Sequence, residues 1–115
     1  MRVLVCGGRS FDNYDKIIKC LDSIHKKHGV DLIIEGGASG ADAHAATWAN
    51  NKGIPRVSMP ANWIFHDKKA GPIRNENMIK LLNPDCVVAF EGGNGTNNMC
   101  SLARKYGIKL WETWK

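Results

Sequence analysis

The chain alternates short apolar runs with longer stretches in which apolar residues recur every three or four positions. Runs of four or five apolar residues are too short for helices and predict buried strands. Spacing such as Ile17, Leu21 and Ile24 predicts an amphipathic helix between Ser10 and Gly29. We expect strands at 3–6, 32–35, 56–59, 86–90 and 108–111, and further helices at about 41–51, 72–82 and 96–106.

This alternation of strands and helices predicts the fold class. It implies an α/β protein with parallel strands and right-handed crossovers, and 115 residues suffice for one domain. We expect a Rossmann-like three-layer sandwich of about five parallel strands in the order 3-2-1-4-5. The loops after the first and fourth strands would then flank the topological switch point, where ligands bind in such sheets.

Three glycine-rich turns each follow a predicted strand and precede a predicted helix. Thr96 can cap the helix after the last of these turns. A strand, a glycine turn and a helix N-terminus direct free N–H groups at one spot, which suits a phosphate or carboxylate. One such turn can reflect only a tight bend, but three on one rim favour a ligand site. The candidate contacts in these turns are Gly7, Gly8, Arg9, Gly36, Gly37, Ser39, Gly40, Asp42, Gly92, Gly93, Asn94, Gly95 and Thr96.

Several side chains near these turns allow two interpretations. Arg9 can pair with a phosphate or form a surface salt bridge. Asp42 can hold ribose hydroxyls, or stabilise the N-terminus of its own helix. Arg74, with Asn75 beside it, lies near a helix N-terminus, where a cation is disfavoured, so a role in anion binding is a further candidate. Trp63 can stack on a base or cover the edge of the core.

The composition of the chain limits the classes of binding partner that we expect. The net charge of +5 favours anionic partners, but the basic residues form pairs and not long runs, so no nucleic-acid tail is indicated. The four cysteines include no CxxC pair, which predicts reduced, buried thiols and no metal site. No apolar run reaches membrane-spanning length, and we expect a cytoplasmic protein without a membrane partner.

Five motifs in order resemble those of the SLOG superfamily, most closely its YspA/YpsA-related branch of small bacterial and phage proteins. They are Gly7-Gly8-Arg9, the turn 36–42, residues 60–63, the segment 70–78 with Arg74, Asn75 and Met78, and the turn 92–96. The resemblance covers nearly the whole chain and implies one Rossmann-like domain over residues 1–115. It also implies a ligand at the glycine-rich rim and a possible homodimer.

Members of this superfamily differ in function. The LOG enzymes are phosphoribohydrolases that cleave the N-glycosidic bond of nucleoside monophosphates. Other members sense nucleotide derivatives, and DNA-processing protein A binds single-stranded DNA. The resemblance therefore implies a nucleotide or nucleotide-derived ligand as the partner. Phosphoribohydrolysis is the alternative, and single-stranded nucleic-acid binding is a third possibility.

One position separates the first two functions. The hydrolases carry PGGxGTxxE, whose glutamate is the expected acid/base, and an arginine in a preceding helix that Arg74 matches. Here Met99 stands in place of that glutamate and Glu91 in place of the proline. A thioether cannot transfer a proton, so we expect binding without hydrolysis, with Met99 facing the ligand. Arg74 and Glu91 remain the candidate catalytic residues, and no cofactor is expected.

Overall fold

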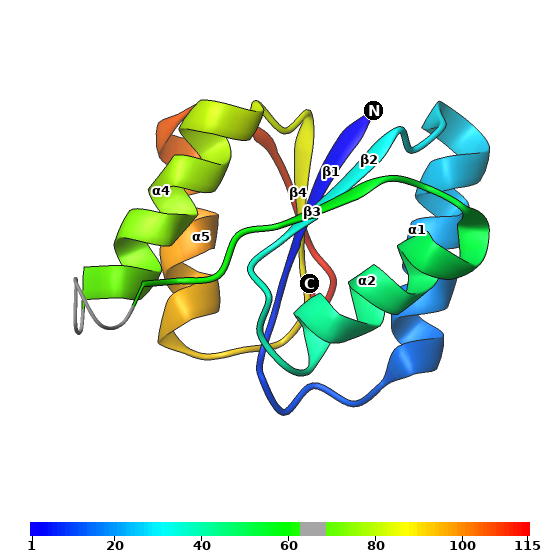
Figure 1. Cartoon of the computed structure of the whole chain (residues 1–115), viewed down its shortest axis with the longest axis horizontal. Helices are drawn as coiled ribbons and strands as arrows, with labels where there is room; N and C mark the ends of the chain where they lie inside the picture. Colours follow the sequence, from blue (N-terminus) through cyan, green and yellow to red (C-terminus); the bar gives the residue numbers. More distant parts are fainter. Residues whose placement is uncertain (63–68) are drawn as a thin grey trace.

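A computed structural model describes residues 1–62 and 69–115, and in this part of the chain strands and helices alternate (Figure 1). Short runs rich in apolar residues form most of the strands, and stretches with apolar residues three or four apart form the helices. The elements are β1 (Arg2–Cys6), α1 (Tyr14–His28), β2 (Leu32–Glu35), α2 (Ala41–Lys52), β3 (Arg56–Ser58), α4 (Ala70–Leu82), β4 (Cys86–Ala89), α5 (Asn94–Lys105) and β5 (Lys109–Glu112).

The strands form one parallel sheet in the order β3-β2-β1-β4-β5. Val3 of β1 pairs with Ile33 of β2 and with Cys86 of β4, so β1 is the central strand. The predicted α/β class, the parallel sheet and the strand order are confirmed. The topological switch point lies between β1 and β4, as the order requires.

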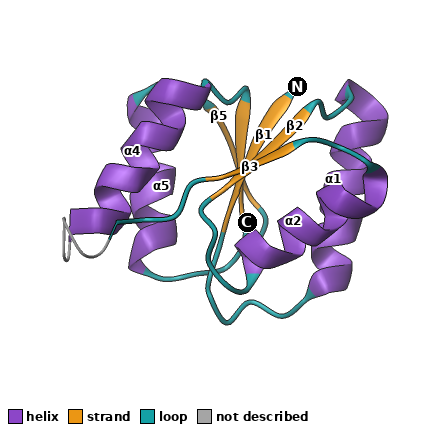
Figure 2. Ribbon diagram, viewed as in Figure 1, coloured by secondary structure: helices purple, strands orange, loops and turns teal. Residues whose placement is uncertain are grey.

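Helices cover both faces of the sheet and make it a three-layer sandwich (Figure 2). Alternate side chains of β1 point to opposite faces, so Val3 and Val5 pack with α1 and α2, whereas Leu4 and Cys6 pack with α4 and α5. No helix in the described ranges is both long enough and apolar enough to cross a membrane.

The three glycine turns meet at the carboxyl edge of the sheet. The Gly8 N–H donates to Glu91 O of the β4–α5 turn (2.9 Å), and the Ala41 N–H at the start of α2 donates to Gly8 O (3.2 Å). Gly40 has φ 72°, and a side chain there would overlap the Gly8 carbonyl. The backbones of all three turns are therefore in contact, as the repeated strand–glycine–helix pattern predicts.

Some boundaries differ from the sequence prediction. Gly93, and not Thr96, is the N-cap of α5, so this helix starts at Asn94 and Thr96 is a buried residue of its first turn. Helix α4 begins at Ala70, two residues before Pro72. A proline fits there because the N–H groups of the first turn have no intrahelical acceptor.

Candidate ligand-binding site

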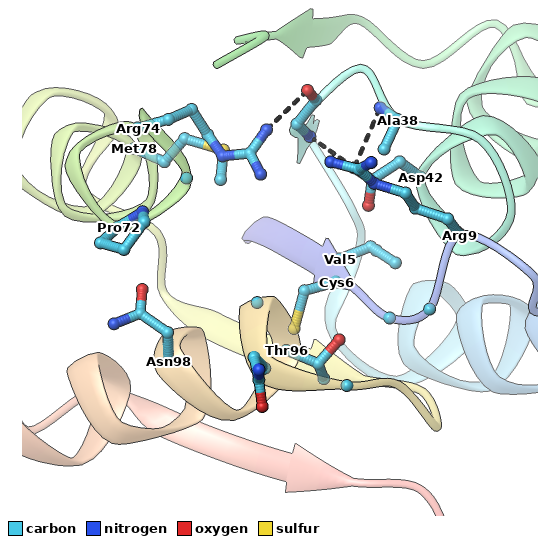
Figure 3. A pocket seen from close by; sticks show the side chains of 17 residues that line it. Val5, Cys6, Arg9, Ala38, Asp42, Pro72, Arg74, Met78, Thr96 and Asn98 are labelled. Carbon is cyan, nitrogen blue, oxygen red and sulfur yellow. Dashed lines mark hydrogen bonds between the residues drawn. The ribbon is translucent and has the colours of Figure 1, made fainter. Parts of the chain in front are cut away.

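A cavity of about 490 Å³ opens at the carboxyl edge of the sheet, between the α4 and α5 N-termini and the turns after β1 and β2 (Figure 3). Its volume lies within the range of small-molecule sites. The residues that line it are Val5, Cys6, Gly7, Gly8, Arg9, Gly36, Ala38, Asp42, Gly71, Pro72, Arg74, Met78, Gly93, Asn94, Gly95, Thr96 and Asn98.

The α5 N-terminus forms one wall of the cavity. The first helical hydrogen bond runs from the Asn97 N–H to Gly93 O (3.0 Å), and no side chain caps the helix. The N–H groups of Asn94, Gly95 and Thr96 therefore precede this bond, and they have no acceptor among the described residues. Such groups, at the positive end of a helix dipole, form a site for an anion.

Gly93 and Gly95 leave this wall open. A Cβ atom added at either position meets no atom within 4 Å, and Gly93 has an ordinary φ of −100°. Neither backbone strain nor packing within the described residues therefore requires glycine at these positions. At Gly92, by contrast, a Cβ would overlap the Thr96 hydroxyl and lie 2.7 Å from the Gly8 nitrogen.

Arg74 forms the opposite wall, and three acceptors fix its guanidinium. Its Nη1 donates to Gly36 O (2.7 Å) and to Met59 O (3.3 Å), and its Nε donates to Asn75 Oδ1 (2.8 Å). Its Nη2 makes no hydrogen bond to the described residues, and the guanidinium projects toward the cavity (Figure 3). The arginine is thus oriented before any ligand arrives, which lowers the entropy cost of binding.

Asn75 connects this arginine to the α5 wall. Because its Oδ1 accepts from Arg74, its Nδ2 must donate, and it does so to Gly95 O (3.2 Å) and Asn98 Oδ1 (3.0 Å). Asn98 accepts this hydrogen bond through its carbonyl oxygen and also lines the cavity. The Arg74 guanidinium and the N–H groups at the α5 N-terminus therefore make the α4–α5 side of the cavity a donor surface, as an anionic ligand requires.

A second cation lies across the cavity from α4. Arg9 lines the cavity and is exposed. Burial lowers the pKa of Arg74, and the positive charge of Arg9 lowers it further, while Asp42 and Glu35 act in the opposite direction. Because the two guanidinium groups are close enough to repel each other, an anion bound between them would offset this repulsion.

Asp42 is the one carboxylate that lines the cavity in the described part of the chain. Its Oδ2 accepts from the Gly36 N–H (3.1 Å) and the Ala38 N–H (3.2 Å), so it shapes the β2–α2 turn. Burial raises the pKa of Asp42 to about 6, although these two N–H groups and the Arg74 guanidinium act to lower it. A carboxyl group that titrates near neutral pH in a cavity is a functional candidate.

Replacement of Asp42 by asparagine should change how stability depends on pH. The folded-state pKa lies above the usual 3.8, so protonation stabilises the folded protein, and this contribution is lost as pH rises through 6. Between pH 5 and pH 7 the free energy of unfolding of the wild type should fall by roughly 1 kcal/mol relative to the variant. Urea unfolding at both pH values measures the difference.

Glu76→Gln is the matched control for this experiment. Glu76 is more exposed than Asp42, and a hydrogen bond from Tyr106 lowers its pKa, so it stays ionised above pH 5. This variant should differ from the wild type by the same amount at both pH values. If Asp42→Asn also differed from the wild type by the same amount at both pH values, the pKa of the Asp42 carboxyl would not be raised.

A smaller pocket of about 320 Å³ adjoins the cavity and shares Arg9, Gly36, Ala38 and Arg74 with it. Gly37 and Ser39 line only this side pocket. Glu35 is buried and accepts hydrogen bonds from the Gly37 N–H (2.5 Å) and the Ser58 hydroxyl. This carboxylate helps to fix the β2–α2 turn, which contributes residues to both pockets.

The structure therefore brings most of the predicted contact residues together. The cavity contains Gly7, Gly8, Arg9, Gly36, Asp42, Arg74, Gly93, Asn94, Gly95 and Thr96. Three others support the walls from behind: Gly40 packs on Gly8, Gly92 packs on Thr96, and Asn75 is 4% exposed. Trp63 lies outside the described residues.

Two predicted positions differ from expectation. Glu91, a candidate catalytic residue, does not line the cavity and forms an ion pair with Lys16 (2.8 Å). Met99 does not face the ligand site, since it is 0% exposed in the core between α4, α5 and the sheet. The apolar stripe Thr96, Met99, Cys100 and Ala103 turns toward the sheet, and only Thr96, at its top, reaches the cavity.

Sequence reasoning missed several residues of the cavity. One of them is Asn98, which lies four positions after Asn94 and three after Gly95 and therefore on the same side of α5. Helical spacing alone could have indicated this residue. Cys6 ends a buried strand and was interpreted only as a core thiol. Gly71 and Pro72 enter the cavity because α4 starts earlier than predicted.

Comparison with known proteins shows the family of this chain. The model of the YspA, cpYpsA-related SLOG family matches residues 1–66, which contain the first two glycine turns. The chain is also similar to the Gene 61 protein of Mycobacterium phage D29, with 34% identity over 118 residues that cover 95% of this chain and 93% of that protein. The chain therefore belongs to the YspA, cpYpsA-related SLOG family.

Proposed function

We propose that this protein binds a nucleotide or nucleotide-derived ligand, with a phosphate at the α5 N-terminus and Arg74 beside it. Membership in the SLOG family suggests nucleotide-related binding or processing. The observation that carries the proposal is the set of hydrogen-bond donors at the cavity. It comprises the N–H groups of residues 94–96 and the Arg74 guanidinium.

The remaining walls suit the rest of a nucleotide. Asp42 accepts its two hydrogen bonds through Oδ2, so its Oδ1 is the acceptor that a ribose hydroxyl would meet. The side pocket behind Arg9 and Arg74 provides room for a second group of the ligand. The cavity and its side pocket together thus match a ligand with an anionic end and a polar, hydroxyl-bearing body.

A thermal-shift screen tests the proposal. The panel contains adenosine and guanosine monophosphates and diphosphates, ADP-ribose and cyclic dinucleotides, with the free nucleosides as phosphate-free controls. A ligand present at a hundred times its dissociation constant should add about 2.7 kcal/mol to the free energy of unfolding. Equal stabilisation by a nucleoside and its monophosphate would contradict phosphate binding.

Arg74→Ala should weaken binding of a nucleotide from that panel by about 1.5–3 kcal/mol, the contribution of a hydrogen bond to a charged group. The corresponding nucleoside should lose little affinity, and isothermal titration calorimetry measures both. Lys80→Ala removes a cation from the exposed side of the same helix and should leave the affinity unchanged. Equal losses for nucleotide and nucleoside would show that Arg74 does not contact phosphate.

Phosphoribohydrolysis is a second candidate, and one observation favours it. Asp42 lines the cavity, and its pKa of about 6 suits a general acid or base near neutral pH. Two backbone N–H groups hold this carboxylate in the turn, however, so we expect little or no hydrolysis. If the wild type released ribose 5-phosphate and Asp42→Asn did not, this expectation would be overturned. Asp42 would then be the catalytic acid.

A further inference from the structure

Asn75 is a buried residue of α4 that contacts both walls of the candidate site without lining the cavity. Its Oδ1 accepts from Arg74 Nε (2.8 Å), and its Nδ2 donates to Gly95 O (3.2 Å) in the first turn of α5. Arg74 and Gly95 both line the cavity. The Asn75 side chain therefore links the guanidinium to the helix turn that we assign to the phosphate, and we call this link the Asn75 bridge.

The partners of Asn75 require a carboxamide. Arg74 Nε can only donate, whereas Gly95 O and Asn98 Oδ1 both act as acceptors here. A carboxamide offers one oxygen and two N–H groups, and so it meets all three partners. Aspartate would place a second oxygen against two acceptors, and leucine has a similar shape but no polar atom. Because Asn75 is 4% exposed, water would not replace a partner that is lost.

Apolar contacts hold α4 and α5 together below the cavity. Met78 and Ile79 of α4 belong to the same buried cluster as Met99 and Ala103 of α5. The Asn75 bridge, by contrast, joins the N-terminal half of α4 to the first turn of α5, where the cavity opens. Its position therefore indicates that it orients the cavity walls more than it holds the fold.

We propose that Asn75 is a positioning residue that holds the Arg74 guanidinium in place relative to the α5 N-terminus, so that both bind one phosphate. The proposal rests on the proposed function, since it concerns the same phosphate. Without the bridge, Nε loses its acceptor, and Gly36 O and Met59 O hold the guanidinium through Nη1 alone. The side chain then has more freedom to lose when a ligand binds. The effects of substitutions at Arg74 and Asn75 should therefore be non-additive.

A double-mutant cycle tests the proposal, with isothermal titration calorimetry of inorganic pyrophosphate as the readout. Arg74→Ala should weaken binding about tenfold to hundredfold, and Asn75→Leu about tenfold although this side chain lies behind the wall. The double variant should bind no more than about threefold more weakly than Arg74→Ala alone. Asn77→Leu changes an exposed residue of the same helix that does not line the cavity, and it should leave the affinity unchanged. Circular dichroism checks that each variant is folded.

Hydrogen exchange in the ligand-free wild type gives a second measurement, which needs no variant. The Asn75 amide donates two hydrogen bonds in a buried position, whereas Asn77 is exposed. In NMR spectra the side-chain N–H protons of Asn75 should therefore exchange with solvent at least about tenfold more slowly than those of Asn77. Equal exchange rates would overturn the Asn75 bridge.

The outcomes separate the positioning role from the proposed function. If the wild type binds neither pyrophosphate nor any nucleotide of the panel, the proposed function is wrong and the positioning role with it. If the wild type binds them but the losses at Arg74 and Asn75 simply add, only the positioning role is overturned. Wild-type affinity in a folded Asn75→Leu protein would overturn the positioning role in the same way.

Discussion

Replacement of Gly95 by valine is expected to abolish nucleotide binding while the protein stays folded. A Cβ at this position meets no atom of the described residues within 4 Å, and Gly95 lines the cavity at the proposed phosphate site, so we expect the valine side chain to fill space that the phosphate needs. Valine also has a higher helix propensity than glycine, so α5 should not be weakened. Gly93→Val should have the same effect, and the thermal-shift panel with circular dichroism measures both binding and folding.

Two variants nearby serve as controls. Asn97→Ala changes an exposed residue of the same helical turn that does not line the cavity, and it should bind like the wild type. Gly92→Ala should instead destabilise the fold, because its Cβ overlaps the Thr96 hydroxyl. Wild-type affinity in a folded Gly95→Val protein would show that the α5 N-terminus does not hold the ligand.

Replacement of Met99 by glutamate is expected to destabilise the protein by about 3–5 kcal/mol, the cost typical of an uncompensated buried charge. Met99 is fully buried among apolar side chains such as Leu4, Met78 and Val87. The members of that cluster are hydrophobic residues, which offer no partner for a new carboxylate. Urea unfolding measures the loss, and the midpoint should move to a much lower concentration.

Met99→Leu is the matched control, since it conserves volume and should cost less than about 1.5 kcal/mol. In the enzymes that the chain resembles, this position carries the glutamate, so from the sequence alone Met99→Glu is a candidate for hydrolase activity. The structure predicts a large loss of stability for this variant instead. A stable Met99→Glu protein that releases ribose 5-phosphate would contradict the buried position of Met99.

The fold could be predicted because each local signal agreed with the others. Apolar runs such as 86–89 marked the strands, and a glycine turn followed three of them. These turns lie on one edge because the carboxyl ends of parallel strands must meet there. Most of the cavity residues followed from this geometry without any knowledge of side-chain contacts.

The orientation of individual side chains could not be predicted in the same way. The sequence left a ribose contact and a role at the N-terminus of its own helix open for Asp42. The structure shows that Asp42 accepts two N–H groups of its own turn, which depends on loop geometry and not on spacing. Glu91 pairs with Lys16, which lies 75 positions earlier in the chain. The position of Met99 was misjudged although its signal was present, since Thr96, Met99 and Ala103 follow the spacing of a buried helix face.

The central claim is that the α5 N-terminus holds the phosphate, and backbone amide signals in NMR test it most directly. The isotope-labelled protein is titrated with inorganic pyrophosphate, with the nucleotide that stabilises it most, and with the matching nucleoside. We predict that both phosphate ligands shift the amides of Asn94, Gly95 and Thr96 and the Arg74 Nε–H signal. The nucleoside should leave these signals unchanged. Shifts confined to the basic end of α1, at 25–28, would contradict the claim.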